Sequence, residues 1–149
     1  MPIDTITIMP DHGQAYAWRL PPGLPPWAGV GGNIGGFFGW GGDQPISPEL
    51  KQAFIEWQGE FESYDWVETD SPVGNNYSRF NWPWFHDRGI DLAIRLKAEL
   101  GDSVIVVYEK PYEDYGRDIA ERTEILAGGK LKPLPSRKKL AALEQASNH

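Results

Sequence analysis

Four carboxylates that follow one another closely are the first candidates for chemistry: Glu60, Glu62, Asp65 and Glu68. Two carboxyl groups held in different environments can act as a general acid and a general base. This chain, however, holds 21 Asp and Glu residues against 14 Lys and Arg, so carboxylates fall close together by chance. The spacing alone therefore does not predict catalysis, and the same side chains suit a charged binding surface.

Two histidines are the other candidates, because His12 follows Asp11 and His86 precedes Asp87. Imidazole and carboxylate groups together can bind a transition metal. No H-x-x-x-H or other paired spacing joins them, so we expect a surface or helix-capping role for each histidine. The chain has no cysteine, which excludes disulfides, thiolate metal sites and a thiol nucleophile. We therefore predict no metal and no cofactor.

Eight glycines fall within residues 29–42, a density that invites comparison with nucleotide-binding loops. The dinucleotide motif requires G-x-G-x-x-G, but after Gly29 and Gly31 the third glycine position is taken by Ile34. No G-K-[ST] sequence is present to make a phosphate-binding loop. We interpret this segment as an irregular loop ordered by its aromatic residues, with one strand expected at residues 36–40.

The strongest pattern lies between Asp43 and Asp70, where eight acidic residues accompany one basic residue, Lys51. Tryptophans in and beside the same stretch could serve as apolar anchors. An acidic surface with aromatic anchors suits a basic protein partner and repels nucleic acid and anionic membranes. We predict that eight residues form this partner-binding surface: Trp40, Glu56, Glu60, Glu62, Asp65, Trp66, Glu68 and Asp70.

The overall charge supports the same class of partner. The net charge is -7, and because residues 130–149 hold five basic residues and one acidic residue, the rest of the chain carries about -11. Phosphate contacts need a basic surface, so DNA and RNA are disfavoured as main partners. The longest apolar run, residues 104–108, is too short to span a membrane, and the N-terminus has no signal-peptide pattern. We expect a soluble, cytoplasmic protein.

The acidic stretch contains the clearest predicted helix, over residues 47–63. Ser47 is a good N-cap residue and Pro48 fits the first helical position. Apolar residues recur on one face of this helix at helical spacing: Leu50, Ala53, Phe54, Trp57 and Phe61. Trp57 is therefore predicted to lie in the core. Gly59 weakens a helix, so we expect close packing there.

A second helix is predicted over residues 83–100, started by Pro83 and ended at Gly101. Its core face follows the same spacing: Phe85, Gly89, Leu92, Ala93, Leu96 and Leu100. A buried strand is expected directly after it, over residues 103–108. Weaker strand patterns occur around Ile6 and over residues 14–20, and residues 119–126 suit either a strand or a short helix.

Together these elements predict a single α+β domain over residues 1–129. Its two main helices would pack on one face of a small, mainly antiparallel sheet. Residues 130–149 are predicted to be a basic, flexible C-terminal tail, with a weak helix over residues 136–146.

The order of core residues resembles a known family. It runs Ile46-Ser47-x-x-Leu50-x6-Trp57-x3-Phe61-Glu62, and continues after a loop with Phe85-x3-Gly89-x2-Leu92-Ala93-x2-Leu96-x3-Leu100-Gly101 and a valine-rich strand. Over about residues 36–110 the chain resembles small bacterial proteins of the polymorphic-toxin immunity type. The resemblance implies a non-enzymatic inhibitor that docks onto a toxin, and it supplies no functional residues.

Three hypotheses follow from the sequence. The leading one is an immunity protein whose acidic surface covers the active site of a basic bacterial toxin domain. The second is a small-molecule-binding or catalytic domain with a pocket between the glycine-rich segment and four nearby side chains: Trp82, Trp84, His86 and Arg88. The third is an assembly subunit of a larger bacterial machine.

Overall fold

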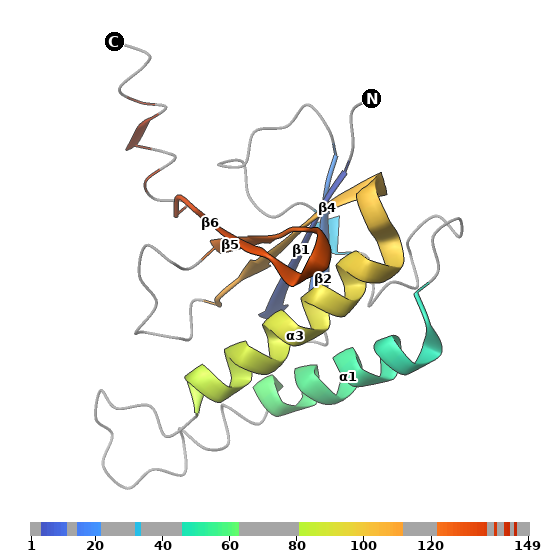
Figure 1. Cartoon of the computed structure of the whole chain (residues 1–149). Coiled ribbons are helices and arrows are strands. Elements are labelled where there is room, and N and C mark those ends of the chain that lie inside the picture. The colour runs from blue at the N-terminus through green and yellow to red at the C-terminus, as the bar shows by residue number, and fades with distance from the viewer. Residues whose placement is uncertain are drawn as a thin grey trace, which may run out of the picture.

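The computed structural model describes residues 4–11, 15–21, 32–33, 46–62, 81–111 and 122–136, together with residues 139, 142, 143 and 145. Two helices lie side by side over one face of a six-stranded sheet (Figure 1). The helices are α1, Pro48–Glu62, and α3, Trp82–Leu100. The predicted α+β class, with both main helices on one face of the sheet, is confirmed.

The sheet has the strand order β3-β2-β1-β4-β5-β6. These strands are β1 Asp4–Asp11, β2 Ala15–Leu20, β3 Gly32–Asn33, β4 Val104–Glu109, β5 Arg122–Ile125 and β6 Leu131–Leu134. Four of the five strand pairings are antiparallel, and the central pairing of β1 with β4 is parallel. The sheet is therefore mainly antiparallel, as predicted, around one parallel pair.

Helix α1 begins as its sequence predicts. The backbone N–H of Leu50 donates to the Ser47 hydroxyl at 3.2 Å, which is the expected N-cap bond. Ser47 in turn donates from its backbone N–H and its hydroxyl to the Glu99 carboxylate, each at 2.7 Å. The start of α1 is thus attached to the end of α3, and the two helices run antiparallel.

Helix α3 begins one residue earlier than predicted. Asn81 caps it by accepting a hydrogen bond from the Trp84 backbone N–H at 3.1 Å, so Pro83 occupies the second helical position. At the other end Gly101 has φ +66°, a left-handed conformation that glycine adopts without strain. The short 3₁₀ turn Gly101–Ser103 then leads directly into β4.

The core between helices and sheet is rich in aromatic rings. Trp57 is fully buried and stacks on Phe85 with ring centroids 4.6 Å apart, and its indole N–H donates to the Phe85 carbonyl at 3.0 Å. The predicted core position of Trp57 is confirmed. Gly89 brings α3 close to these rings, since a Cβ there would lie 2.5 Å from a ring carbon of Tyr108 and 2.6 Å from one of Trp57.

The prediction of close packing at Gly59 is wrong. A Cβ built on Gly59 would meet nothing within 4 Å, and the residue is exposed. Within the described parts of the two helices, Gly89 of α3 is the glycine at which the helix backbone closely approaches the core side chains.

Two tyrosines of the sheet support the two helices. Tyr16 of β2 stacks on Phe54 of α1, with centroids 5.4 Å apart and rings 11° from parallel. Burial raises the pKa of the Tyr16 hydroxyl to about 12, because the charged phenolate is disfavoured away from water. Tyr108 of β4 lies beneath α3, where its hydroxyl is 2.7 Å from Nδ1 of His86.

The expected surface or capping role of His86 is therefore wrong. The His86 ring is only 5% exposed and stacks on Trp82 with centroids 5.6 Å apart. A histidine in the first turns of a helix can point inward when its neighbours at helical spacing do, and His86 follows Trp82 by four residues. The other internal histidine, His12, lies outside the described residues.

A buried ion pair lies on the opposite side of the sheet. Tyr108 points toward the helices, so the next residue of β4, Glu109, points to the other face. There it lies beside its cross-strand partner Arg122, with 3.5 Å between the Glu109 carboxylate and Arg122 Nε. Arg122 also donates from Nη1 to the Pro135 carbonyl at 2.8 Å. This arginine therefore links β4 and β5 to the segment that follows β6.

The remaining strand predictions have mixed outcomes. Strands were expected around Ile6 and over residues 14–20, and they are found as β1 and β2. Of the two alternatives for residues 119–126, the strand is found at β5. Within the glycine-rich segment the structure places β3, whereas the strand expected at residues 36–40 lies outside the described residues. The domain boundary at residue 129 stays a prediction, although β6 continues the sheet beyond it.

Candidate interaction surface

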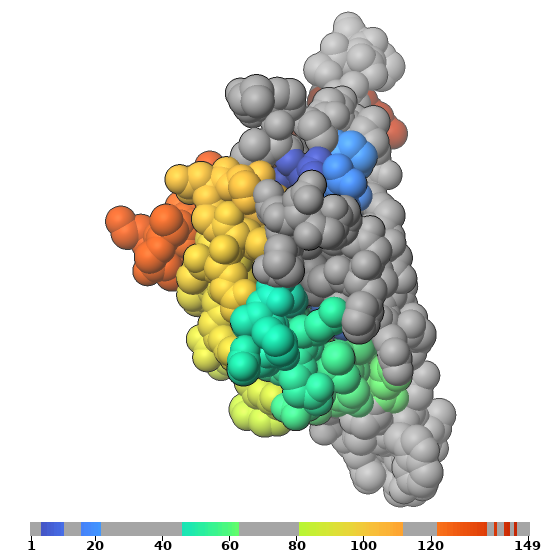
Figure 2. Space-filling model, turned by 90° about the vertical axis from the view of Figure 1, so that its right-hand side faces the viewer, coloured from blue at the N-terminus to red at the C-terminus, as the bar shows by residue number. Residues whose placement is uncertain are grey.

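The outward faces of α1 and α3 adjoin on one surface of the molecule (Figure 2). On α1 the side of the helix nearest α3 carries Glu49, Ala53, Glu56 and Glu60, at helical spacing. On α3 the corresponding side carries Trp84, Arg88, Asp91 and Arg95. A shallow hollow of about 210 Å³, here called the inter-helix groove, opens between these two rows. Its lining is mostly charged: Ala53, Glu56, Arg88, Asp91, Leu92 and Arg95.

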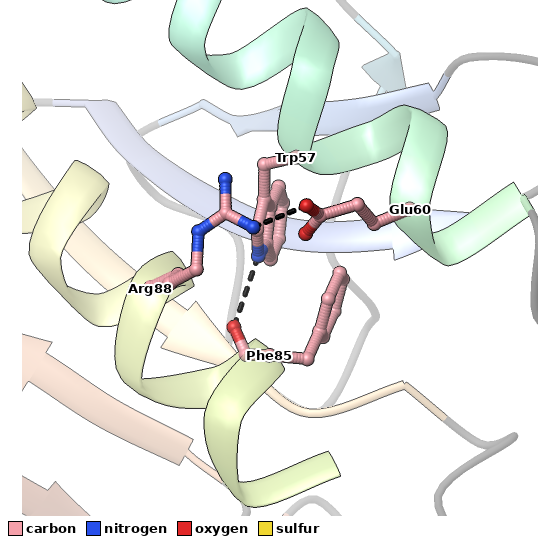
Figure 3. A network of polar contacts seen from close by, with 4 residues as sticks. All are labelled: Trp57, Glu60, Phe85 and Arg88. Atoms are coloured by element: carbon pink, nitrogen blue, oxygen red, sulfur yellow. Dashed lines mark hydrogen bonds and ion pairs between the residues drawn. The ribbon is translucent and has the colours of Figure 1, made fainter. Parts of the chain in front are cut away.

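An ion pair closes one end of the inter-helix groove. Arg88 of α3 donates from Nη1 to the Glu60 carboxylate of α1, and each side chain is about one-third exposed. Figure 3 shows the two side chains reaching toward each other beside the ring of Trp57. The indole N–H of Trp57 donates a hydrogen bond to the Phe85 carbonyl. The pair therefore lies directly over the aromatic core that joins the two helices.

The predicted acidic residues of α1 do not form one face. Glu56 is exposed and accepts a hydrogen bond from the Gln52 side chain at 3.5 Å. Glu60, one turn later, lies on the same side of the helix and forms an ion pair with Arg88. Glu62 lies two residues beyond Glu60, which is about 200° around the helix axis, so it points away from α3.

The other five predicted partner-binding residues lie outside the described residues: Trp40, Asp65, Trp66, Glu68 and Asp70. Their part in a binding surface stays a prediction. Within the described residues, Glu56 and Glu60 are the two predicted residues that the structure brings together on the α3 side of α1.

Trp84 is an exposed tryptophan on this surface that was not predicted from the sequence. This side chain is 49% exposed, and the guanidinium carbon of Arg88 lies 4.7 Å from the centre of its ring. Two signals were present in the sequence. Trp84 falls off the predicted core spacing of α3, and Arg88 follows it by four residues, which places the two side chains together on a helix.

The four side chains of the pocket hypothesis do not converge on one cavity. Trp82 and His86 are at most 6% exposed and pack within the core. Trp84 and Arg88 lie on the outer surface instead. The part of the chain that the structure describes therefore does not favour a ligand pocket at this place.

Two further features bear on the class of protein. Among the described residues, no group of three or more His, Asp or Glu side chains could hold a metal ion. Neither of the described long helices has a stretch apolar enough to cross a membrane.

The structure places these surface residues within a segment that matches a known family. Residues 41–111 match the family model described as Serratia CdiI immunity protein-like. This CdiI-like segment is just under half of the chain and includes α1, α3 and β4. No curated protein and no solved structure matches the chain.

The predicted resemblance to toxin-immunity proteins is thus confirmed, over nearly the residues from which it was inferred. CdiI proteins are immunity proteins against contact-dependent inhibition toxins and are typically non-enzymatic.

Proposed function

We propose that this chain is a non-enzymatic immunity protein that binds and inhibits a bacterial toxin domain in the cytoplasm. The observation that carries the proposal is the CdiI-like match over residues 41–111, which contains both helices of the outer surface. The composition of α1 supports it, because this helix holds four acidic residues and one lysine. An acidic helix on the surface attracts a basic partner over distances of about a Debye length.

The proposed mechanism is occlusion of the toxin active site. Glu56 and the acidic residues beyond α1, including Asp65 and Glu68, would face basic residues around that site. Rim charges of this kind mainly increase the association rate, whereas a buried aromatic anchor mainly slows dissociation. Trp40 and Trp66 stay candidate anchors. No cofactor is needed for inhibition by occlusion.

The first test asks whether the chain neutralises a toxin. Tagged full-length protein would be recovered from its native host, and a co-purifying toxin domain would be identified by mass spectrometry. That domain would then be produced in a susceptible bacterium with and without this chain. We expect growth to stop without the chain and to recover with it. Equal growth arrest in both strains would overturn the proposed function.

The second test asks whether the acidic surface guides association. The variant Glu56→Lys reverses one exposed acid of the predicted surface, and Asp102→Lys makes the same charge change at an exposed acid just beyond the end of α3. We expect Glu56→Lys to slow association with the purified toxin domain about threefold at low salt and to flatten its salt dependence. We expect Asp102→Lys to have a smaller effect on both. Equal on-rates for the two variants would count against this surface.

A further inference from the structure

We infer that Trp84 is an anchor of the partner interface, held in position by Arg88 and Glu60, and that it fits an apolar pocket rimmed by basic side chains on the toxin domain. This inference rests on the proposed function and identifies a contact within it. Glu60 was predicted to meet the partner directly, and we now assign it to a positioning role.

The geometry supports an anchor that is exposed yet ordered. Trp84 is 49% exposed, although it lies in the first turn of a helix whose start is fixed by the Asn81 cap. Arg88 lies against one face of the indole ring, 4.7 Å from its centre. A large, exposed aromatic side chain that is already held in one orientation loses little entropy on binding, which favours affinity.

Arg88 is itself fixed from the other helix. Its guanidinium group is paired with Glu60, so the contact from α1 through Arg88 to Trp84 is continuous across the helix pair. Because Glu60 neutralises Arg88, the cation that covers the ring adds little net positive charge to the surface. Glu60 and Arg88 are therefore positioning residues that act on the partner through Trp84.

The charges around Trp84 indicate the chemistry of the partner. Asp87 is exposed and follows Trp84 by three residues, which places it beside the ring on the surface of α3. Asp91 is also exposed and lies about 10 Å further along the helix, on the same side as Trp84. On the side of α1 that faces α3, Glu49 and Glu56 add further negative charge, because Glu60 is already paired with Arg88. An indole ring beside carboxylates is complementary to an apolar pocket with Lys or Arg at its edge.

The test measures binding of full-length variants to the purified toxin domain identified by the co-purification above. We expect Trp84→Ala to raise the dissociation constant about thirtyfold, mostly through faster dissociation, as for an interface hot spot. Ile55→Ala is the matched control, because Ile55 is 44% exposed and lies on the side of α1 away from α3. We expect this control to change the constant less than twofold. Circular dichroism would establish that each variant is folded.

The positioning role needs a measurement that a purely structural role would not change. Arg88→Ala should raise the dissociation constant about fivefold in the wild-type background and leave it unchanged in the Trp84→Ala background. Independent effects in the two backgrounds would overturn the positioning role.

Several outcomes would overturn the anchor. A complex of wild-type affinity with Trp84→Ala would do so while leaving the proposed function intact, and so would an equal loss with Ile55→Ala. A dimer of the chain alone that Trp84→Ala converts to monomer would assign this surface to a second copy instead. Absence of any complex with the toxin domain would overturn the proposed function and this inference together.

Discussion

Helices α1 and α3 bury similar apolar faces but present different surfaces. Helix α1 carries four acidic residues and one lysine, whereas α3 carries three acidic and three basic residues and is therefore neutral. The exposed tryptophan belongs to the neutral helix. In the proposed complex this difference would divide the roles, because α1 would supply long-range attraction and α3 a short-range apolar contact.

The two helices also differ in how they meet the core. Gly89 of α3 allows the rings of Trp57 and Tyr108 to approach the helix backbone, whereas Gly59 of α1 lies in open space. The tyrosines beneath the helices also differ, because Tyr16 stacks on Phe54 of α1 whereas Tyr108 is hydrogen-bonded to His86 of α3. The packing of α3 is therefore the more demanding of the two, and the same substitution in each helix should have opposite effects.

The largest effect is expected at Gly89. The Cβ of Gly89→Ala would lie within 2.6 Å of two buried rings, so either the rings or the helix must move. We expect the free energy of unfolding to fall by about 3 kcal/mol, at the upper end of ordinary overpacking costs. Urea denaturation followed by tryptophan fluorescence would measure it, and unchanged stability would show that α3 does not need this close approach.

A smaller effect is expected at high pH through Tyr16. The pKa of this tyrosine is near 10 when the chain is unfolded and about 12 when it is folded. The unfolded chain therefore releases its proton first, so the stabilising contribution is complete below pH 10 and is lost between pH 10 and 12. The loss amounts to roughly 2 kcal/mol. Between pH 9 and pH 12, the free energy of unfolding should fall by roughly 2 kcal/mol less in Tyr16→Phe than in the wild type. If it fell equally in the two proteins, the raised pKa of Tyr16 would be contradicted.

The smallest effect is expected at Gly59, and it has the opposite sign. A methyl group there meets no other atom within 4 Å, and alanine favours helix over glycine. Gly59→Ala should raise the free energy of unfolding by about 1 kcal/mol, measured in the same urea experiment. A loss of stability would show that α1 has a close contact at this position in solution.

The helices could be predicted from the sequence because their signals are local. Ser47 begins one helix and Gly101 ends the other through their own hydrogen bonding and backbone conformation, and the apolar spacing identified Trp57 as a core residue. The residues of strand β6 belong to the segment predicted to be a flexible tail, because residues 130–149 are rich in basic side chains. It forms by pairing with β5, a partner that no local pattern identifies.

The candidate surface was less predictable for the same reason. Helix geometry alone places Glu62 and Glu60 on opposite sides of α1, so this difference could have been predicted from the sequence. The pairing of Glu60 with Arg88 could not, because it depends on how α1 docks against α3. The buried pair of Glu109 and Arg122 was likewise hidden, since charged residues are seldom buried unless tertiary structure pairs them.

The parallel pairing of β1 with β4 sets an order of events during synthesis. Thr5 pairs with Ile105, so the two central strands leave the ribosome about a hundred residues apart. At about 5–20 residues per second, this delay is roughly 5–20 s. During that time the β1–β2 hairpin has an open inner edge, which is a site for unwanted strand pairing. Because β4 must pair with β1 before β5 and β6 can join the sheet, the nascent hairpin depends on this late strand to cover its edge.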